Sequence, residues 1–265
     1  MFSFQKIKEF QEKVLSFYEE EGRDLPWRKT SDPYAILLSE VMLQQTQVNR
    51  GIIYFQKWLE QWPTVFDLAR ADRADVLKAW MGLGYNMRAL RLHTTMKIIA
   101  SQFDGDILKA LEEYKKLPGI GKYSAAAVKI FSTNCDAVTV DTNIRRIFIH
   151  EFSLSEDVSE KELWDLAWKC LPKGKSRDWH NALMDYGSLV LTSQKTKIKA
   201  KTRQSRFEGS DRQLRAKILR FVLEKKEVSF EEMYSFGKKD KVERVLNSLE
   251  KDQLLVLKDR MYILK

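Results

Sequence analysis

A glycine-containing turn between two helical segments constrains the fold of this chain more than any other feature. The turn reads Leu117-Pro-Gly-Ile-Gly-Lys-Tyr-Ser124 and leads into Ala125-Ala-Ala-Val128, a run of small residues that favours helix. A helix N-terminus carries unpaired N–H donors and partial positive charge, and a phosphate can approach a backbone that lacks side chains. The turn therefore suits a nucleic-acid backbone. The residues expected to contact that backbone are Gly119, Gly121, Lys122 and Ser124.

An aspartate downstream of the turn helps to decide between two interpretations of it. By themselves, two glycines between helices indicate a C-cap followed by a turn, and a lone aspartate is most often an N-cap. Here Asp141 follows the apolar run Ala137-Val-Thr-Val140 and precedes an expected helix at 143–149. The turn and the aspartate in this order resemble the helix-hairpin-helix DNA glycosylases, the superfamily that holds endonuclease III and MutY.

A carboxylate interrupts a strongly apolar helix in the first part of the chain. Asp32-Pro-Tyr34 predicts a turn and an N-cap for the helix Ala35–Leu43, and Glu40 lies within this helix. Burying an ionised carboxylate is costly, so Glu40 lies either on an exposed stripe of the helix or in a pocket where its pKa is raised. Periodicity alone favours the exposed stripe.

The segments around Glu40 closely resemble the catalytic-acid region of MutY-type adenine DNA glycosylases. The likeness extends over about residues 20–192, with several motifs in the family's order, and it favours the pocket for Glu40. It implies a mostly α, two-lobed glycosylase domain at 1–206, with a six-helix lobe at about 30–140 and a second lobe from the N-terminal helix plus about 141–206. The matching segments are Leu25-Pro-Trp-Arg28, Pro33-Tyr34, Ser39–Val48, Trp80–Tyr85, Arg88-Ala89, Leu92-His93, the turn with Tyr123, Val140–Asn143 and Asn181–Gly187.

The resemblance implies a division of labour between two carboxylates. Glu40 would protonate a ring nitrogen of the departing base, and Asp141 would stabilise or transiently trap the oxocarbenium-like sugar. Tyr123 and Asn143 would orient the carboxylates and the sugar. The alternative role for Tyr123 is packing between helices.

Excision of a base from duplex DNA also requires contacts that take the base out of the stack and fill the gap. By resemblance, Arg23 and Arg28 would hold the purine edge and the neighbouring phosphate; single arginines are more usually surface charges. Another group of residues would form a wedge that intercalates and contacts the orphaned partner base. Its members are Gln45, Thr46, Leu83, Gly84 and Tyr85.

Tyr123 also indicates the reaction type. In the related glycosylases that nick the DNA backbone, this hairpin position is a lysine that forms a Schiff base with the sugar. Here it is tyrosine, and the lysine one step earlier, Lys122, is expected to touch a phosphate. We therefore predict a monofunctional glycosylase that releases a free base and leaves an abasic site.

The chain departs from the MutY pattern where an iron–sulfur cluster is usual. Family members usually hold a four-iron cluster on four cysteines just after the segment that matches Leu189–Thr192. The following stretch, 193–206, is rich in lysine and has no cysteine, and Cys135 and Cys170 both lie upstream. We therefore expect no cluster and no resident metal, with only a cation on the hairpin carbonyls possible when DNA is bound. The lysine-rich stretch is either a basic linker or a DNA-facing segment.

Two further departures leave the identity of the excised base open. The usual motif has glycine at Thr142 and a second aromatic residue at Asn86, and a related thymine-mismatch branch carries small non-glycine residues at the first position. Adenine mispaired with 8-oxoguanine or G is the expected substrate. The alternatives are thymine or uracil in a mismatch, on the same scaffold, and a DNA-binding protein without activity. The presence of both Glu40 and Asp141 argues against the last alternative.

The C-terminal segment is shorter than the hydrolase-like domain with which MutY proteins normally end. Residues 207–265 predict helices at 211–225, 229–234 and 239–251, then two alternating strands within 254–264 around a tight turn. Three helices and a hairpin predict a winged-helix-like domain. We expect it to contact DNA and to share in lesion recognition, with a small packing module as the alternative.

Composition agrees with a DNA-binding protein. The 265 residues carry a formal net charge of +9, which favours a polyanionic partner, here double-stranded DNA with a mismatch or lesion. No apolar run reaches the length of a membrane span and no secretory signal opens the chain, so a cytoplasmic monomer is expected, associated with the nucleoid in a prokaryote. The three histidines lack metal-ligand spacing and are expected to be structural.

Overall fold

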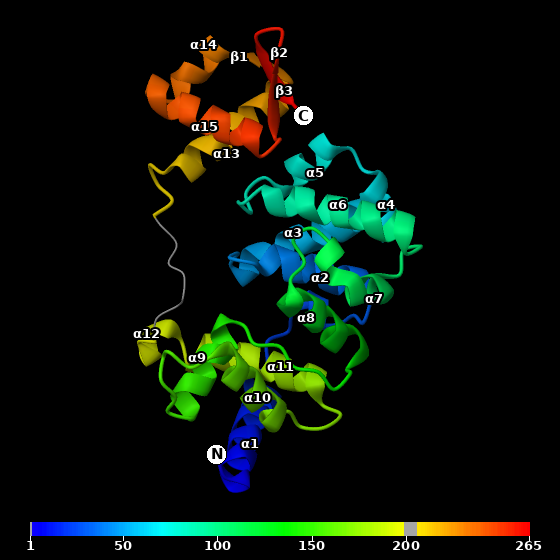
Figure 1. The fold of residues 1–265 in the computed structure, drawn as a ribbon, viewed down its shortest axis with the longest axis vertical. Coiled ribbons are helices and arrows are strands. Elements are labelled where there is room, and N and C mark those ends of the chain that lie inside the picture. The colour runs from blue at the N-terminus through cyan, green and yellow to red at the C-terminus, as the bar shows by residue number, and fades with distance from the viewer. Residues whose placement is uncertain (1, 199–205) are drawn as a thin grey trace.

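The structure is a computed structural model that describes residues 2–198 and 206–265. It is mostly helical, which confirms the predicted fold class (Figure 1). The elements up to residue 198 are α1 (Phe4–Glu21), the 3₁₀ helix η1 (Pro26–Arg28), α2 (Pro33–Leu43), α3 (Val48–Gln61), α4 (Val65–Arg70), α5 (Arg73–Trp80), α6 (Met87–Gln102), α7 (Ile107–Ala110), the 3₁₀ helix η2 (Leu111–Lys116), α8 (Lys122–Thr133), α9 (Thr142–Glu151), α10 (Glu160–Cys170), α11 (Ser176–Asp185), the π-helix η3 (Tyr186–Val190) and α12 (Ser193–Thr196). Those after residue 206 are α13 (Asp211–Lys225), β1 (Glu227–Ser229), α14 (Phe230–Met233), the 3₁₀ helix η4 (Tyr234–Phe236), α15 (Lys239–Lys251), β2 (Leu255–Lys258) and β3 (Met261–Leu264).

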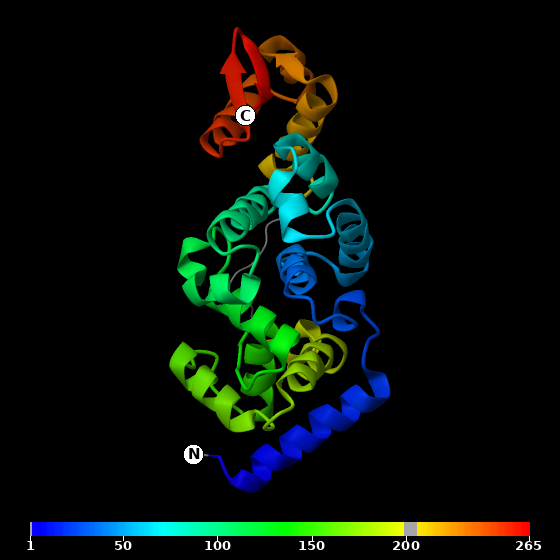
Figure 2. The same ribbon diagram turned by 90° about the vertical axis from the view of Figure 1, so that its right-hand side faces the viewer.

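Three buried clusters distinguish three parts of the molecule. The first lobe, α2 to α8, encloses a core that includes Leu37 and Trp58. In the second lobe, α1 packs on α10 and α11 around a core that includes Phe148 and Trp179. The C-terminal module, residues 207–265, contributes most of a third core. Figure 2 shows the N-terminal helix and this module at opposite ends of the elongated molecule.

α2 is a central helix of the first lobe because nearly all of its surface is apolar. Pro33 starts the helix, and the Asp32 carboxylate accepts hydrogen bonds from the N–H groups of Tyr34 (3.0 Å) and Ala35 (3.3 Å), as the predicted N-cap requires. α3 and α8 pack against it. Eight residues of the helix are buried, so it has no exposed stripe, and the position that periodicity alone favoured for Glu40 is wrong.

A buried aspartate ties the two lobes together. The chain crosses from α1 to α2 through residues 22–32, and Asp185, at the end of α11, is fully buried beside this crossing. Its carboxylate accepts hydrogen bonds from the Arg23 backbone N–H (2.8 Å), from the Arg23 side chain (2.7 Å) and twice from Arg28 (2.8 Å each). Burial raises the pKa of Asp185, but the hydrogen bonds and charges of the two arginines outweigh it and hold this pKa below its usual value.

The C-terminal module combines α13, α14 and α15 with an antiparallel sheet in the order β1-β3-β2. The sequence predicts two strands, and the structure adds β1. Three residues are too few to show an alternating pattern, and this strand is defined by its pairing, in which the buried Val228 faces Tyr262 of β3. The winged-helix assignment stays a prediction. Within residues 2–198 and 206–265, no helix combines the length and the apolar character needed to cross a membrane.

Replacing Asp185 with alanine is expected to lower the free energy of unfolding by about 3–5 kcal/mol, because Arg23 and Arg28 lose their counter-charge in the interior. Urea denaturation at neutral pH measures this change. Asp24→Ala is the control: the Asp24 and Lys29 side chains pair at 75% and 65% exposure, and such surface pairs contribute only about 0–1 kcal/mol. Equal effects of the two substitutions would contradict the role of Asp185.

Candidate active site

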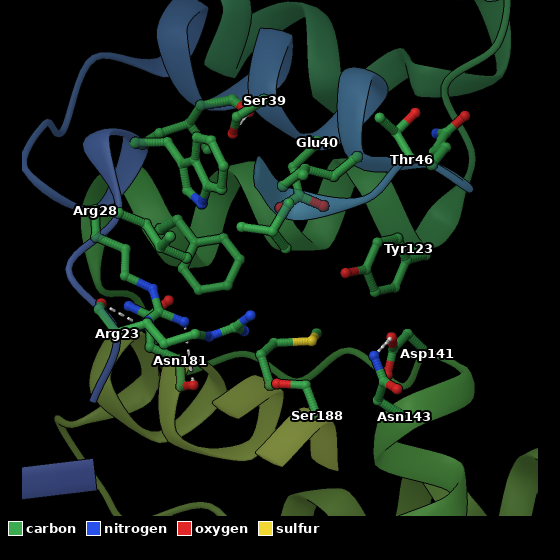
Figure 3. A pocket seen from close by; sticks show the side chains of 18 of the residues that line it. Arg23, Arg28, Ser39, Glu40, Thr46, Tyr123, Asp141, Asn143, Asn181 and Ser188 are labelled. Carbon is green, nitrogen blue, oxygen red and sulfur yellow. Dashed lines mark hydrogen bonds between the residues drawn. The ribbon is translucent and has the colours of Figure 1, made fainter. Parts of the chain in front are cut away.

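A cavity of about 600 Å³ lies between the two lobes (Figure 3). One wall comes from α2 and the loop after it, and the facing wall comes from the start of α9 and from α11. Its volume is in the range of about 300–1,000 Å³ that is usual for small-molecule sites. The predicted site residues that line it are Arg23, Arg28, Glu40, Gln45, Thr46, Tyr123, Asp141 and Asn143.

Glu40 projects from α2 into this cavity (Figure 3). Burial raises the pKa of Glu40 to about 7, and the negative charge of Asp141 adds to the rise, while hydrogen bonding with the Tyr123 hydroxyl opposes it. A carboxyl group with a pKa near neutrality holds a proton that it can transfer, as a general acid must. The structure therefore places Glu40 in the pocket that the family resemblance implies.

Asp141 lies on the facing wall and also caps α9. Its Oδ1 accepts a hydrogen bond from the Ile144 N–H (2.7 Å), and its Oδ2 accepts one from the Asn143 side chain (3.1 Å). Burial raises the pKa of Asp141, although these hydrogen bonds and the charge of Arg146 act in the opposite direction. Asp141 is thus both the N-cap of α9 and a residue of the cavity wall.

Arg146 extends this network behind Asp141. Its guanidinium group donates hydrogen bonds to the Asn143 side-chain oxygen (2.8 Å) and to the carbonyls of Gly187 and Leu191 (2.7 Å each). Arg146 is only 8% exposed. Because Arg146 binds the oxygen of the Asn143 amide, the nitrogen of that amide is directed at Asp141.

Tyr123 stands between the two carboxylates. Figure 3 shows its hydroxyl directed into the cavity, with Glu40 on one side and Asp141 on the other. Burial raises the pKa of Tyr123 well above its usual value, and the negative charges of Glu40 and Asp141 add to the rise. The hydroxyl therefore keeps its proton and can donate a hydrogen bond to a carboxylate. Packing alone does not explain why this polar group points into the cavity.

Arg23 and Arg28 line the cavity, but both pair with Asp185. Arg28 also donates a hydrogen bond to the Arg23 carbonyl (2.9 Å), and its side chain is 10% exposed, so it is not the surface charge that a single arginine usually is. The contacts with a purine edge and a phosphate that the sequence predicts for these arginines stay predictions.

The predicted hairpin forms an exposed turn between η2 and α8. Gly119 has a φ of +83°, and a Cβ atom there would lie 3.1 Å from the Cβ of Arg91, so this position favours glycine. Gly119, Gly121 and Lys122 are exposed. Ser124 lies on the inner side of α8 at 3% exposure, so it is not on the exposed face of the turn, and its contact with a DNA backbone stays a prediction.

Arg88 joins the two loops that the sequence predicts as the wedge. Its guanidinium group donates hydrogen bonds to the Thr46 hydroxyl (3.3 Å) and to the carbonyls of Leu83 and Gly84 (3.0 Å each). Burial lowers the pKa of Arg88 to about 10, so the group stays charged at neutral pH. One partly buried cation thus fixes the end of α2 against the loop 82–86.

The wedge residues differ in their exposure. Gln45 and Gly84 are exposed, and Tyr85 is 42% exposed. Leu83 is 5% exposed and packs in the core of the first lobe, so it lies inside the protein rather than on the predicted intercalating surface. Gln45 and Tyr85 have φ values of +57° and +50°, which non-glycine residues seldom adopt.

Comparisons with known proteins connect this geometry to a family. The family model for the HhH-GPD superfamily base excision DNA repair protein matches residues 38–173. A Mycolicibacterium smegmatis protein named adenine DNA glycosylase is 35% identical over 227 residues, which cover 78% of each chain. The chain belongs to the HhH-GPD superfamily of base excision DNA repair proteins.

Other relatives of this HhH-GPD protein bear on its substrate. A Methanothermobacter thermautotrophicus protein named thymine/uracil-DNA glycosylase is 30% identical over 196 residues, which cover 72% of this chain and 89% of the relative. The solved structure of a thermostable thymine-DNA glycosylase matches with a TM-score of 0.66 and 29% identity, over 72% of this chain and 90% of that one. The chain spans 37–39% of the length of mammalian relatives named adenine DNA glycosylase. The resemblance to MutY-type glycosylases is confirmed.

The residues of this HhH-GPD chain do not fit the four-cysteine iron–sulfur cluster that is usual in MutY-type proteins. Thr192 caps α12, and the stretch 193–206 offers no thiol, while its residues 199–205 lie outside the described part of the chain. Cys135 is exposed and Cys170 is buried in the second lobe, where burial raises the pKa of its thiol to about 12. In the part of the chain that the structure describes, no three His, Cys, Asp or Glu residues gather as metal ligands. The cation at the hairpin stays a prediction.

Three charged residues of the site are not singled out by the sequence: Arg88, Arg146 and Asp185. Each lies within or next to a matching motif. Arg146 contacts the Asn143 side chain three residues away on α9, but the other partners of these three residues are distant in the sequence or are backbone carbonyls. Spacing rules detect neighbours on one helix and do not detect such contacts. The available signal is the occurrence of a charged residue among apolar ones, as in Ile144-Arg-Arg-Ile147.

Glu40→Gln is expected to stabilise the protein above neutral pH. A carboxyl whose pKa rises from about 4.5 to about 7 on folding contributes stability that is complete below pH 4.5 and is lost as the pH rises through 7. Relative to wild type, the variant should therefore gain about 1–3 kcal/mol at about pH 8 and nothing near pH 4.5. Urea denaturation at both pH values measures the difference, with Glu60→Gln on the exposed face of α3 as the control. A difference that does not depend on pH would contradict the raised pKa.

Proposed function

We propose that this protein is a monofunctional DNA glycosylase that removes adenine mispaired with 8-oxoguanine or G from double-stranded DNA. The observation that carries the proposal is that Glu40 and Asp141 lie on facing walls of one cavity. The family supports base excision, and the relatives named adenine DNA glycosylase support the choice of substrate.

The two carboxylates would act on the bond between C1′ of the deoxyribose and N9 of adenine. Glu40 donates its proton to a ring nitrogen of the extruded base, the electron pair of the glycosidic bond passes to the base, and neutral adenine leaves. The sugar becomes an oxocarbenium-like cation, which the Asp141 carboxylate stabilises. Water then adds to C1′ and returns a proton to Glu40, which completes the cycle with an abasic site as the product.

Tyr123 and Asn143 would hold the two carboxylates in place during this reaction. Tyr123 also supports a reaction without strand cleavage, because a hydroxyl cannot form a Schiff base with the sugar. Lys122, which directly precedes Tyr123 in the sequence, does not line the cavity. Its ammonium nitrogen lies 3.7 Å from the centre of the Trp164 ring. This position of the Lys122 amine outside the cavity supports a reaction without a Schiff base.

The DNA contacts would come from the hairpin and from the two loops that Arg88 joins. Gly119, Gly121 and Lys122 present an exposed helix N-terminus to a phosphate, and the net charge of +9 favours this polyanion. Extrusion of the base costs a few kcal/mol, which contacts in the vacated gap offset. Tyr85 is the exposed aromatic residue of the loop 82–86 and would provide such a contact.

The C-terminal module would add to the DNA-binding surface. Its three helices and small antiparallel sheet support the winged-helix assignment, and such modules commonly place a helix in a DNA groove. We propose a monomer that engages one mismatch or lesion with both parts.

Excision of thymine or uracil from a mismatch is the second candidate function. Thr142 lines the cavity beside Asp141, where the usual MutY motif has glycine. Relatives named thymine/uracil-DNA glycosylase and thymine-DNA glycosylase match this chain over 72% of its length. A β-branched side chain next to the catalytic aspartate narrows the space for the sugar and the base, which is the feature that favours this candidate.

Single-turnover base release identifies the substrate. The duplexes carry A, T, U or hypoxanthine opposite 8-oxoguanine or G, and the full chain is in excess. We expect the fastest release for adenine opposite 8-oxoguanine, with an intact strand until alkali cleaves the abasic site. Release of T or U opposite G with adenine spared would establish the second candidate. Binding of every duplex without release of any base would leave a DNA-binding protein without activity.

Glu40→Gln and Asp141→Asn are each expected to lower the rate of base release by about 10²–10⁴-fold, because each removes the acid or the cation stabiliser. Duplex binding should persist, since neither residue is expected to contact a phosphate. For wild type, the rate should fall as the pH rises through about 7, where Glu40 loses its proton. A rate that rises through this range, or variants with wild-type rates, would exclude Glu40 as the acid.

A further inference from the structure

The C-terminal module is fixed to the first lobe by a shared apolar core. Leu77 of α5 and Leu90 of α6 are buried among the module's own residues, which include Leu214 and Ile218 of α13. Figure 1 shows α13 close to α5, and these two helices are in contact. The module therefore has a defined position on the lobe that carries Glu40.

The loop 82–86 borders the contact between the C-terminal module and the first lobe. Met81 and Met87, at the two ends of the loop, are partly buried against the shared core. Within the loop, Gly82, Gly84 and Tyr85 have φ values of +108°, +74° and +50°. A tyrosine in this region is uncommon and persists only where its surroundings hold it.

Arg212, in the first turn of α13, supplies such a contact. One nitrogen of its guanidinium group donates a hydrogen bond of 2.8 Å to the Tyr85 hydroxyl. The guanidinium carbon lies 5.7 Å from the centre of the Tyr85 ring and 5.9 Å from that of Phe207. Tyr85 nevertheless remains 42% exposed, which leaves surface on which a base can stack.

We propose that Arg212 is a positioning residue through which the C-terminal module sets the enzyme's preference for the base opposite the extruded one. The inference rests on the proposed function, in which Tyr85 contacts the gap that the extruded base leaves, and on the expected contact of Tyr85 with the partner base. Arg88 joins the loop of Tyr85 to the segment of Thr46, so a shift of Tyr85 also bears on the rim of the cavity. Arg212 acts through Tyr85 and does not touch the reacting atoms.

Binding to an abasic analogue tests this role without base release. The full chain is titrated with duplexes that carry tetrahydrofuran opposite 8-oxoguanine, G, C or T. The partner preference is the largest of the four Kd values divided by the smallest. Arg212→Ala should reduce this ratio by about fivefold, because it removes a cation–π contact and a hydrogen bond. Arg212→Lys should restore it only in part, since an ammonium lacks the planar guanidinium geometry.

Tyr85→Phe keeps the ring and removes the hydroxyl that Arg212 binds, so it should lower the ratio as well. The double variant should be no worse than Arg212→Ala, because both changes remove the same interaction. Lys217→Ala, at an exposed position of α13, is the control and should keep the wild-type ratio.

Three results would overturn the inference: no partner preference in wild type, additive effects in the double variant, or an unchanged ratio in Arg212→Ala, whether affinity is kept or is lost equally for all partners. An equal loss of affinity for all partners would identify Arg212 as a general phosphate contact. The full chain could release no base and still show a partner preference that depends on Arg212. This result would reject the proposed excision and leave the role of Arg212 in place.

Discussion

The pairing of buried Asp185 with Arg23 and Arg28 is the interaction on which the cavity depends. A fully buried carboxylate is tolerated only when cations and hydrogen bonds compensate it, and here both cations come from the short crossing between α1 and α2. The pairing holds the crossing against the end of α11. It thereby sets the position of α2, which carries Glu40, relative to the second lobe, which carries Asp141.

The two carboxylates of the cavity differ because their backbone surroundings differ. Glu40 lies inside a helix whose N–H groups are already bonded within that helix, so burial dominates and its pKa rises to about 7. Asp141 lies at a helix N-terminus, where N–H groups and the helix dipole favour its negative charge and oppose the rise in pKa that its burial causes. The proton therefore belongs on Glu40 and the charge on Asp141, which is the arrangement that an acid and a cation stabiliser need. The same N-cap that starts α9 thus places the second functional group.

Local features of the fold could be predicted from the sequence, and contacts between distant segments could not. Asp32 and Asp141 were recognisable as N-caps because their bonding partners follow within three residues. The burial of Glu40 required the resemblance, since periodicity alone placed it on an exposed stripe. The inward position of Leu83 and the partners of Asp185 depend on how the lobes pack, and no local pattern reports that. The third strand of the C-terminal module was missed for a similar reason, because its three residues are defined only by their pairing with β3.

Titration of Glu40 by NMR tests most directly whether this side chain holds a proton at neutral pH. Protein labelled with carbon-13 at the glutamate carboxyl groups gives a signal for each glutamate, and Glu40→Gln identifies the Glu40 signal by its loss. We predict a midpoint near pH 7, which Asp141→Asn shifts downward because the charge of Asp141 contributes to the raised pKa. A midpoint near the ordinary value of about 4.5, unaffected by Asp141→Asn, would contradict the assignment of Glu40 as the acid.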